Sequence, residues 1–277
     1  MKTIQELIQL STLYLQERKV ERARRNAEEL LSHILGLKRI DLYLQFDRPV
    51  EEKELARLRE WLKRLAKGEP LEYITGEVQF FGCRIKVDPR ALIPRTETEI
   101  LADLIAKRIQ GKTLWDLCTG PGTLGLSLKK ALPHMEVSLS DISPDALALA
   151  RDNARENGVE VEFLLGDLLA PFAGKVADAV VCNPPYISIQ EYIEIAPSVR
   201  DYEPKGALVG GERGTEFYER LAAELPPFLK SGGQLFLEIG AAQGVAVKEI
   251  FQSDPWVKLE LLKDWSGKDR FFFLEKQ

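Results

Sequence analysis

The sequence predicts an α/β fold in which a small helical bundle precedes a mostly parallel sheet with helices on both faces. Three observations carry this prediction. Apolar residues recur at helical spacing over residues 1–75, whereas over residues 91–277 short apolar runs of strand length alternate with helical patterns. Between these segments, in residues 76–90, Gly76 and Gly82 interrupt two short apolar runs, which predicts a β-hairpin that links the two domains.

Three helices are expected in the N-terminal domain. Their apolar positions gather in the runs Ile4–Leu15, Ala23–Ile34 and Leu55–Leu65. Gly36 and Gly68 follow the second and third runs, where a glycine commonly ends a helix. Helices with one apolar face must bury it against each other, so a bundle is predicted.

The C-terminal domain is predicted to contain a row of buried strands. A helix is expected ahead of the first strand, because Thr96 and Glu99 have the spacing of a capping box before an apolar helical pattern. Runs of mainly apolar residues then indicate strands buried on both faces, as in parallel sheets. The predicted strands are Thr113–Leu117, Glu136–Ser140, Val161–Leu165, Ala177–Cys182, Gln234–Ile239, Val257–Leu262 and Arg270–Leu274.

The composition limits what the protein can bind. The formal net charge is -5, so no nucleic acid partner is expected, although residues 1–70 carry 15 Lys/Arg against 12 Asp/Glu. No apolar run reaches membrane-spanning length, and Glu6 and Gln9 interrupt the pattern near the N-terminus, so neither membrane contact nor a signal peptide is expected. The three cysteines lie far apart, which predicts no disulfide, no metal site and a cytoplasmic location. We expect a monomer.

A glycine-rich turn follows the first predicted strand, in LWDLCTGPGTLGLSL. Gly120, Gly122 and Gly125 would let the backbone approach a ligand closely. Asp141 lies about 20 residues further on, at the end of the next strand, where a carboxylate can accept hydrogen bonds from ribose hydroxyls. A glycine turn with an acid at that spacing predicts a nucleoside cofactor.

Two cofactor classes fit this turn. Residues 120–125 match the G-x-G-x-x-G pattern of nicotinamide enzymes, so a dehydrogenase remains an alternative. However, Asp116 precedes the turn in a D-x-x-x-G-x-G arrangement that is typical of S-adenosylmethionine enzymes. Asp167 closes the third strand, where such enzymes meet the adenine ring; a helix N-cap is the structural alternative for Asp167. We therefore expect S-adenosylmethionine.

The segment VVCNPPYISI ends the fourth strand with unusual chemistry. Asn183 falls in the same row of strand ends as the acids, and Pro184 and Pro185 remove two backbone donors. The Asn183 side-chain oxygen and the Pro184 main-chain oxygen would be two fixed acceptors, and Tyr186 could supply a flat face. Such a pair suits a planar, conjugated NH2 group that receives a methyl group. The alternative is a simple Asn-Pro-Pro turn.

The segment Asn183–Tyr186 resembles the motif [DNS]-P-P-[YF] of the amino-methyltransferases. Those enzymes methylate an amino or amide nitrogen of adenine, guanine or glutamine. Further segments narrow the resemblance: ALIPRTETE (91–99), VCNPPYI (181–187), YEPKGALVGGERG (202–214) and GGQLFLEIGAAQG (232–244). Together with the helical N-terminal domain, they resemble the release factor glutamine methyltransferases of the PrmC/HemK family. The fold implied is a Rossmann-like methyltransferase sheet preceded by a small helical bundle.

The resemblance implies transfer of a methyl group from S-adenosylmethionine, which leaves S-adenosylhomocysteine. The acceptor would be the glutamine amide in the Gly-Gly-Gln loop of class I peptide chain release factors. Because a three-residue loop offers little surface for specificity and residues 1–75 contain no catalytic motif, we expect residues 1–75 to recognise that partner. A ribosomal-protein glutamine methyltransferase, a nucleic acid amino-methyltransferase and a non-enzymatic helical adaptor remain alternatives. Cys118 departs from the family, which usually has a glycine there. The expected cofactor residues are Asp116, Cys118, Thr119, Gly120, Pro121, Gly122, Asp141, Asp167, Leu168 and Asn183, and the expected catalytic residues are Asn183, Pro184, Pro185 and Tyr186.

Overall fold

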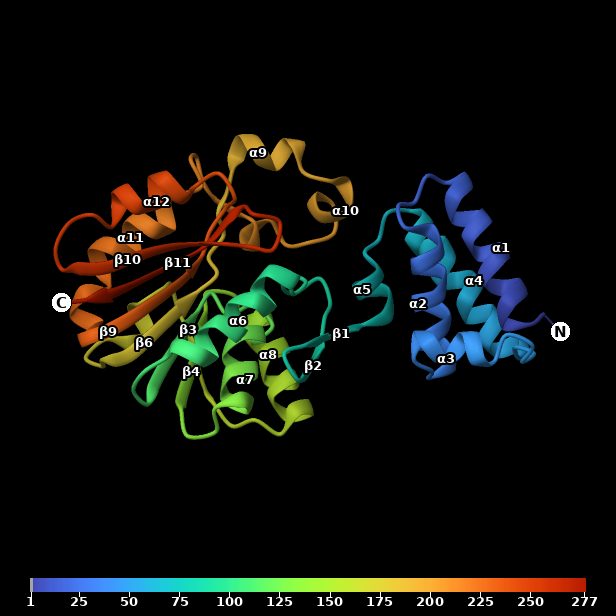
Figure 1. Ribbon diagram of the computed structural model, residues 1–277, viewed down its shortest axis with the longest axis horizontal. Coiled ribbons are helices and arrows are strands. Elements are labelled where there is room, and N and C mark those ends of the chain that lie inside the picture. The colour runs from blue at the N-terminus through green and yellow to red at the C-terminus, as the bar shows by residue number, and fades with distance from the viewer. Residues whose placement is uncertain (1) are drawn as a thin grey trace. The chain divides into compact units, whose positions relative to one another are not determined.

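The computed structural model describes residues 2–277 (Figure 1). The chain forms two compact units, each with its own hydrophobic core. One unit extends to Gly76 and also contains Pro197–Tyr202, and the other comprises Glu77–Ala196 and Glu203–Gln277. None of the described helices is both long enough and apolar enough to cross a membrane.

The first unit is helical, as predicted. Its core is built mainly from leucine and isoleucine side chains and includes Trp61. The helices are α1 (Ile4–Glu17), α2 (Ala23–Leu35), α3 (Arg39–Leu44), α4 (Glu52–Ala66), α5 (Leu71–Thr75) and, from the separate segment, α10 (Pro197–Arg200). Three short helices, α3, α5 and α10, were not predicted, because six residues or fewer cannot display a helical period.

The second unit contains the predicted mostly parallel sheet. Its strand order is β10-β11-β9-β6-β3-β4-β5, and within the described sheet β11 runs in the direction opposite to the other six strands. The α/β fold class is therefore confirmed. The strands are β3 (Thr113–Leu117), β4 (Glu136–Asp141), β5 (Glu162–Leu165), β6 (Ala177–Cys182), β9 (Leu229–Glu238), β10 (Trp256–Lys263) and β11 (Asp269–Lys276), with a separate parallel pair β7 (Ile187–Ser188) and β8 (Val209–Gly211).

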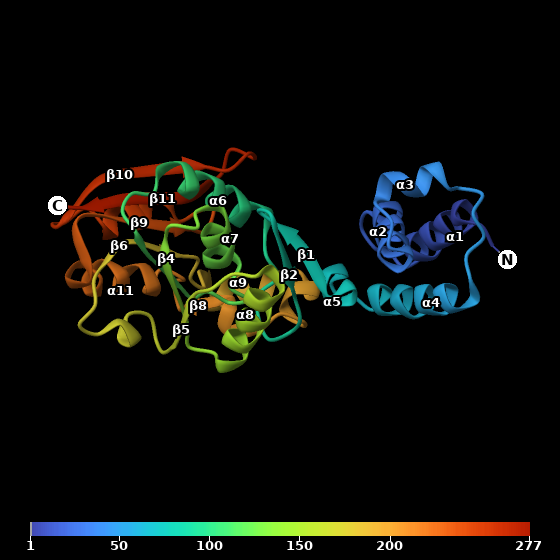
Figure 2. The same cartoon turned by 90° about the horizontal axis from the view of Figure 1, so that it is seen from below.

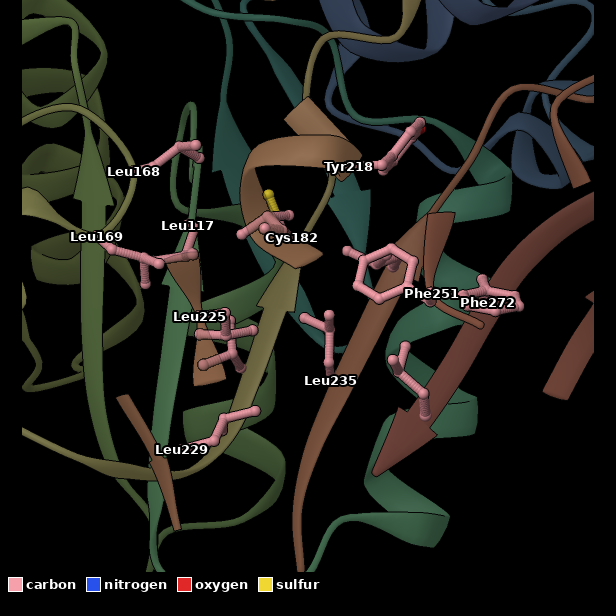
Figure 3. Packing of buried hydrophobic residues seen from close by; sticks show 14 of the residues in the cluster. Leu117, Leu168, Leu169, Cys182, Tyr218, Leu225, Leu229, Leu235, Phe251 and Phe272 are labelled. Atoms are coloured by element: carbon pink, nitrogen blue, oxygen red, sulfur yellow. The ribbon is translucent and has the colours of Figure 1, made fainter. Parts of the chain in front are cut away.

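Helices cover the sheet on both faces because alternate residues of each central strand point to opposite sides. On one face, strand residues and helix residues belong to one buried cluster, in which Phe251 of the α12 C-cap lies beside Phe272 of β11 (Figure 3). The strand residues labelled in the figure include Leu117, Cys182, Leu235 and Phe272. On the other face, α6 and α8 flank α7, which contacts β3. The helices of this unit are α6 (Thr96–Arg108), α7 (Thr123–Ala131), α8 (Pro144–Asn157), α9 (Ile189–Glu194), α11 (Glu216–Glu224) and α12 (Gly244–Ile250), with single 3-10 turns at Ala170–Phe172, Lys205–Ala207 and Pro226–Phe228.

The hairpin between the domains is part of the second unit and lies against α8 (Figure 2). Two amide side chains of α8 bond the backbone of its second strand. Asn153 accepts from the N–H of Lys86 at 2.7 Å and donates to its carbonyl at 3.1 Å, and Asn157 does the same at Arg84. These bonds satisfy strand edge groups that would otherwise lack partners. The hairpin strands are β1 (Glu77–Phe80) and β2 (Cys83–Lys86).

The predicted capping box at the start of α6 is wrong. Thr96 is the first helical residue, and Arg95 occupies the N-cap position without a side-chain hydrogen bond. The carboxylate of Glu99 instead accepts a hydrogen bond from the backbone N–H of Phe81 at 2.7 Å. Phe81 lies in the hairpin turn with φ of +40°, where its N–H needs a partner from outside the turn. A tertiary contact has therefore replaced the local cap.

Candidate active site

The candidate site lies at the carboxyl ends of the parallel strands. The chain runs from β3 outward through β4 and β5 and then returns to β6 on the other side of β3. Such a reversal opens a crevice beyond the strand ends. A cavity of about 290 Å³ is found there, wholly within the second unit. The predicted site residues that line it are Asp116, Cys118, Thr119, Gly120, Pro121, Asp141, Asp167, Leu168, Asn183 and Pro185.

Three of the predicted residues do not line this cavity: Gly122, Pro184 and Tyr186. Gly122 lies at the N-cap of α7 with φ of +85°, and a Cβ there would lie 2.8 Å from Leu126. A glycine is thus needed at this position for both the backbone angle and the close approach of the helix. Pro184 is buried, and the next residue, Pro185, lines the cavity.

Asp141 connects the end of β4 to the glycine turn. One carboxylate oxygen accepts from the backbone N–H of Gly120 at 2.8 Å, and the other accepts from the N–H of Ser143 at 2.9 Å. Burial raises the pKa of Asp141, and the backbone donors oppose that shift. Each oxygen keeps a further lone pair, so the carboxylate can accept two more hydrogen bonds from a ligand in the cavity.

Asp116, at the end of β3, is a buried hydrogen-bond acceptor for the same turn and for the start of α7. It is 1% exposed, and one of its oxygens accepts from the backbone N–H of Gly125 at 2.8 Å and from the Thr119 hydroxyl. Burial raises the pKa of Asp116 to about 7. Because Thr119 lies in the turn and Gly125 in the first turn of α7, these two bonds hold the loop against the helix that follows it.

Cys118, which stands where the resembling family usually has a glycine, adopts a backbone angle that favours glycine. Its φ is +55°, in the left-handed region that glycine adopts freely and other residues adopt at a cost of about 1 kcal/mol. The usual glycine would remove this strain. Gly120, two residues on, has a similar φ of +56°. With Gly122, the turn therefore has three left-handed positions, and Cys118 is the one without a glycine.

The residues present fit a nucleoside cofactor with a polar tail. The Thr123 hydroxyl lines the cavity and is buried without a hydrogen-bond partner among residues 2–277. Asp141 offers its remaining lone pairs for ribose hydroxyls. Apolar side chains complete the walls, which suits the flat face of a purine. These apolar residues are Ala91, Leu92, Leu124, Ile142, Ala146 and Phe217.

Asp167 meets a cation at the edge of the cavity. Arg220 of α11 donates two hydrogen bonds to its carboxylate, at 3.0 and 3.1 Å, and this pairing raises the pKa of Arg220. The N-cap alternative for Asp167 is wrong, because its side chain bonds Arg220 and no backbone N–H in the described chain. Leu168 follows with φ of +43° and is buried.

Asn183 has one half of its amide engaged. Its side-chain NH2 donates to the Thr98 hydroxyl at 3.4 Å, while its Oδ1 has no protein hydrogen-bond partner in the part of the chain that the structure describes. The Pro184 carbonyl likewise accepts no hydrogen bond from the described residues. Gly210 of β8 packs on the motif so closely that a Cβ there would lie 2.2 Å from the Pro185 oxygen. Two acceptors are thus available in a tightly packed segment.

Tyr186 points to a buried charged group. Its hydroxyl donates to Glu238 at 3.4 Å and accepts from Arg270 at 3.5 Å, and burial raises its pKa. Its main-chain oxygen accepts from the Gln243 side chain at 2.8 Å. A flat face toward the substrate remains a prediction for Tyr186, because the structure directs its hydroxyl to Glu238.

Several residues around the site were not predicted as site residues. Glu203 is 4% exposed; it accepts from the N–H of Ile93 at 3.0 Å and pairs with Arg95, which fixes a segment that lines the cavity. Thr98 and Glu238 form the contact behind Asn183. One signal was present in the sequence: Glu238 is a lone acid at the end of the apolar run LFLEIG, where a buried charge needs a reason.

The chain is similar to known proteins over nearly its whole length. Residues 6–76 match the family described as PrmC N-terminal domain, and residues 95–197 match the methyltransferase small domain. The release factor glutamine methyltransferase of Chlamydia trachomatis is 43% identical over 280 residues, covering 99% of this chain and 94% of the relative. That of Geobacter sulfurreducens is 38% identical, covering 97% and 95%.

A solved structure agrees with the fold. A methyltransferase from Pyrococcus furiosus matches with a TM-score of 0.55 and 18% identity, over 82% of this chain and 98% of that chain. The curated relatives extend across both the helical N-terminal unit and the sheet. The chain therefore belongs to the release factor glutamine methyltransferase family.

Proposed function

We propose that this chain transfers the methyl group of S-adenosylmethionine to the side-chain amide nitrogen of the glutamine in the Gly-Gly-Gln loop of class I peptide chain release factors. Its family membership supports the reaction class and disfavours the dehydrogenase and adaptor alternatives. The observation that carries the proposal is Asn183, whose side-chain oxygen is unpaired by the described residues at the wall of a cofactor-sized cavity.

The chemistry needs orientation more than a strong base. S-adenosylmethionine supplies an electrophilic methyl group when it is bound. An amide nitrogen is a weak nucleophile because its lone pair is delocalised into the carbonyl. Asn183 Oδ1 and the Pro184 carbonyl would accept the two amide protons, so that the nitrogen is aimed at the methyl carbon and the positive charge that develops is stabilised. The displaced proton leaves to solvent.

Two related functions are weighed against this one. A nucleic acid amino-methyltransferase would need a basic groove, and the net charge of -5 disfavours it. A ribosomal-protein glutamine methyltransferase would share the same catalytic chemistry. The relatives at 43% and 38% identity carry the release factor name, which favours a release factor as substrate.

The test is a methyl-transfer assay with the full chain. Labelled S-adenosylmethionine is incubated separately with a class I release factor, with ribosomal protein and with DNA or ribosomal RNA. Label is expected on the release factor alone and is expected to disappear when the glutamine of its Gly-Gly-Gln loop is replaced by alanine. Label on ribosomal protein or on nucleic acid, with none on the release factor, would reject the proposal.

The helical unit, residues 1–75, is proposed to dock the release factor outside its methylated loop. Three residues of a loop offer too little surface for specificity. This unit has a groove of about 540 Å³ whose walls include Ile8, Leu13 and Phe46. Leu13 is 56% exposed, and Leu44 on α3 is 79% exposed. An exposed apolar side chain in a groove wall, such as Leu13, is a common docking feature. Leu44 is a second exposed apolar residue of this unit and does not line the groove.

Docking can be tested with the whole chain. Leu13→Glu and Leu44→Glu should raise KM for the release factor by roughly tenfold and leave S-adenosylmethionine binding unchanged. Val245→Glu is the matched control, because Val245 is 70% exposed in the other unit. Equal effects of all three substitutions would remove the groove as a docking surface.

The protein is further proposed to act as a monomer in the cytoplasm, where release factors work.

A further inference from the structure

A chain of hydrogen bonds leads from Asn183 into the protein interior. The Asn183 NH2 donates to the Thr98 hydroxyl at 3.4 Å, and the Thr98 hydroxyl bonds the Glu238 carboxylate at 2.7 Å. Thr98 is 4% exposed and Glu238 is 1% exposed. Burying a carboxylate is costly unless hydrogen bonds compensate for the lost water. Here one of these bonds comes from Thr98, which in turn accepts from Asn183 of the proposed catalytic motif.

The direction of these bonds follows from the number of protons. An ionised carboxylate can only accept, so Thr98 must use its single hydroxyl proton toward Glu238. Toward Asn183, Thr98 then offers only a lone pair. Only the NH2 of Asn183 can bond a lone pair, and its Oδ1 is therefore turned away from Thr98.

We propose that Thr98 and Glu238 are positioning residues that set the orientation of the Asn183 amide, so that its oxygen faces the reacting nitrogen. This inference rests on the proposed function. A glutamine NH2 presents two donors, so a catalytic amide in the opposite orientation would place donor against donor. The difference between the two orientations is one rotation of about 180°, which packing alone distinguishes poorly because O and NH2 are similar in size.

Several groups surround the Glu238 carboxylate. Thr98 of α6 and Tyr186, in the segment after β6, donate hydrogen bonds to it, and the charge of Arg270 of β11 acts on it. Each of the three favours its ionised form. Glu97 opposes ionisation. The Tyr218 hydroxyl of α11 donates at 3.2 Å to the main-chain oxygen of Glu238. Arg270 itself is shared with Asp264, whose carboxylate lies 3.6 Å away.

The arrangement makes the orientation sensitive to protonation. Burial raises the pKa of Glu238 to about 7. A protonated Glu238 can donate to Thr98, which frees the Thr98 proton for the Asn183 oxygen and favours the reversed amide. Activity should therefore fall as the pH is lowered through about 7.

The test uses four full-length variants assayed on release factor. Thr98→Val keeps the shape and removes the hydroxyl, Thr98→Ser keeps the hydroxyl, and Glu238→Gln replaces the acceptor with an amide that can donate. Ser138→Ala is the matched control, because Ser138 also donates from a buried hydroxyl to a glutamate, Glu162 at 2.8 Å, but does not line this cavity.

Thr98→Val and Glu238→Gln should lower kcat by roughly 10- to 100-fold, with KM for S-adenosylmethionine within about threefold of wild type. The kcat of Thr98→Ser should stay within about threefold of the wild-type value, and the kcat of Ser138→Ala should equal the wild-type value. The decline of wild-type activity below about pH 7 should be absent from the residual activity of Glu238→Gln.

Three results would overturn the inference. They are a folded Thr98→Val enzyme with wild-type kcat, equal losses in Thr98→Ser and Thr98→Val, and an unchanged acidic limb in Glu238→Gln. Thermal melting and calorimetry with S-adenosylmethionine identify a variant that has lost its fold; if Thr98→Val does so, the pH profile of Glu238→Gln and the kcat of Thr98→Ser decide. A wild-type enzyme that labels no release factor would instead reject the proposed function.

Discussion

The carboxylate of Asp141 accepts the backbone N–H of Gly120 at 2.8 Å, which joins the end of β4 to the glycine turn after β3. The two residues lie 21 positions apart in the chain. Because adjacent parallel strands end at the same edge of the sheet, the acid and the turn form one wall of the cavity. The same carboxylate can thus order the turn and bind a ligand.

Asp141→Ala should weaken binding of S-adenosylmethionine. The carboxylate would accept two ribose hydroxyls through charge-assisted bonds worth about 2–4 kcal/mol together, so the dissociation constant should rise roughly ten- to several-hundred-fold. Isothermal titration calorimetry measures the change. Asp141→Asn is the companion variant: it keeps an acceptor for Gly120 and separates the turn from the ligand contact. Unchanged affinity in a folded Asp141→Ala protein would remove Asp141 from the cofactor site.

Asn183→Ala should affect chemistry more than binding. It deletes an acceptor that acts mainly in the transition state, so kcat should fall about 10²–10³-fold. Cofactor affinity should change much less than in Asp141→Ala. Asn183→Asp retains an acceptor but loses the donor to Thr98, so it should keep partial activity. Steady-state kinetics on release factor decide the matter, and a folded alanine variant within about twofold of wild-type kcat would reduce the motif to a strand-ending turn.

Glu203→Gln should loosen the segment that covers one wall of the cavity. Glu203 accepts from the Ile93 N–H and pairs with Arg95, and its own side chain is nearly fully buried. Loss of one partner of such a pair should lower stability by roughly 1–3 kcal/mol and raise KM for S-adenosylmethionine a few-fold. Glu162→Gln is the control, because its pair with Lys175 is half exposed. Identical melting temperatures for the two variants would contradict the prediction.

The sequence predicted the sheet because its strands are buried on both faces and appear as continuous apolar runs. Asp141 and Asn183 could be placed at one edge for the same reason, since they end strands that run in one direction. The pairing of Thr98 with Glu238 could not be predicted. These residues are 140 positions apart, and their contact depends on how α6 packs against β9, which no local pattern encodes.

Other misses have local causes. The capping box at Thr96 and Glu99 has the correct spacing, but the Phe81 N–H competes for the same carboxylate. The helices α3 and α5 are too short to show a period. Local signals thus failed where tertiary contacts or short lengths overrode them.

Substitutions at Cys118 should rank by how well each residue tolerates a positive φ. Cys118→Gly removes left-handed strain of about 1 kcal/mol but loses packing and adds unfolded-state entropy, so its stability should stay within about 1 kcal/mol of wild type. Cys118→Val adds a β-branched side chain at φ of +55° and should lose roughly 1–3 kcal/mol. Chemical denaturation measures both. A valine variant as stable as the glycine variant would show that the strain is absent.

The last prediction concerns Asp116 and the pH dependence of stability. Its pKa is about 7 in the folded protein, above its ordinary value of 3.8, because the carboxylate is buried. A carboxyl group with a raised pKa stabilises the fold when protonated, and this contribution is lost as the pH rises from about 4 to about 7. Asp116→Asn keeps an acceptor oxygen for Thr119 and Gly125 and cannot ionise. Its free energy of unfolding relative to wild type should therefore increase over that pH range and level off above it, by an amount of order a few kcal/mol. Denaturant titrations at several pH values provide the measurement, with Glu162→Gln as a control at a half-exposed carboxylate. A difference between Asp116→Asn and wild type that stays constant from pH 4 to pH 8 would mean that Asp116 is already ionised throughout and that its two donors outweigh the effect of burial.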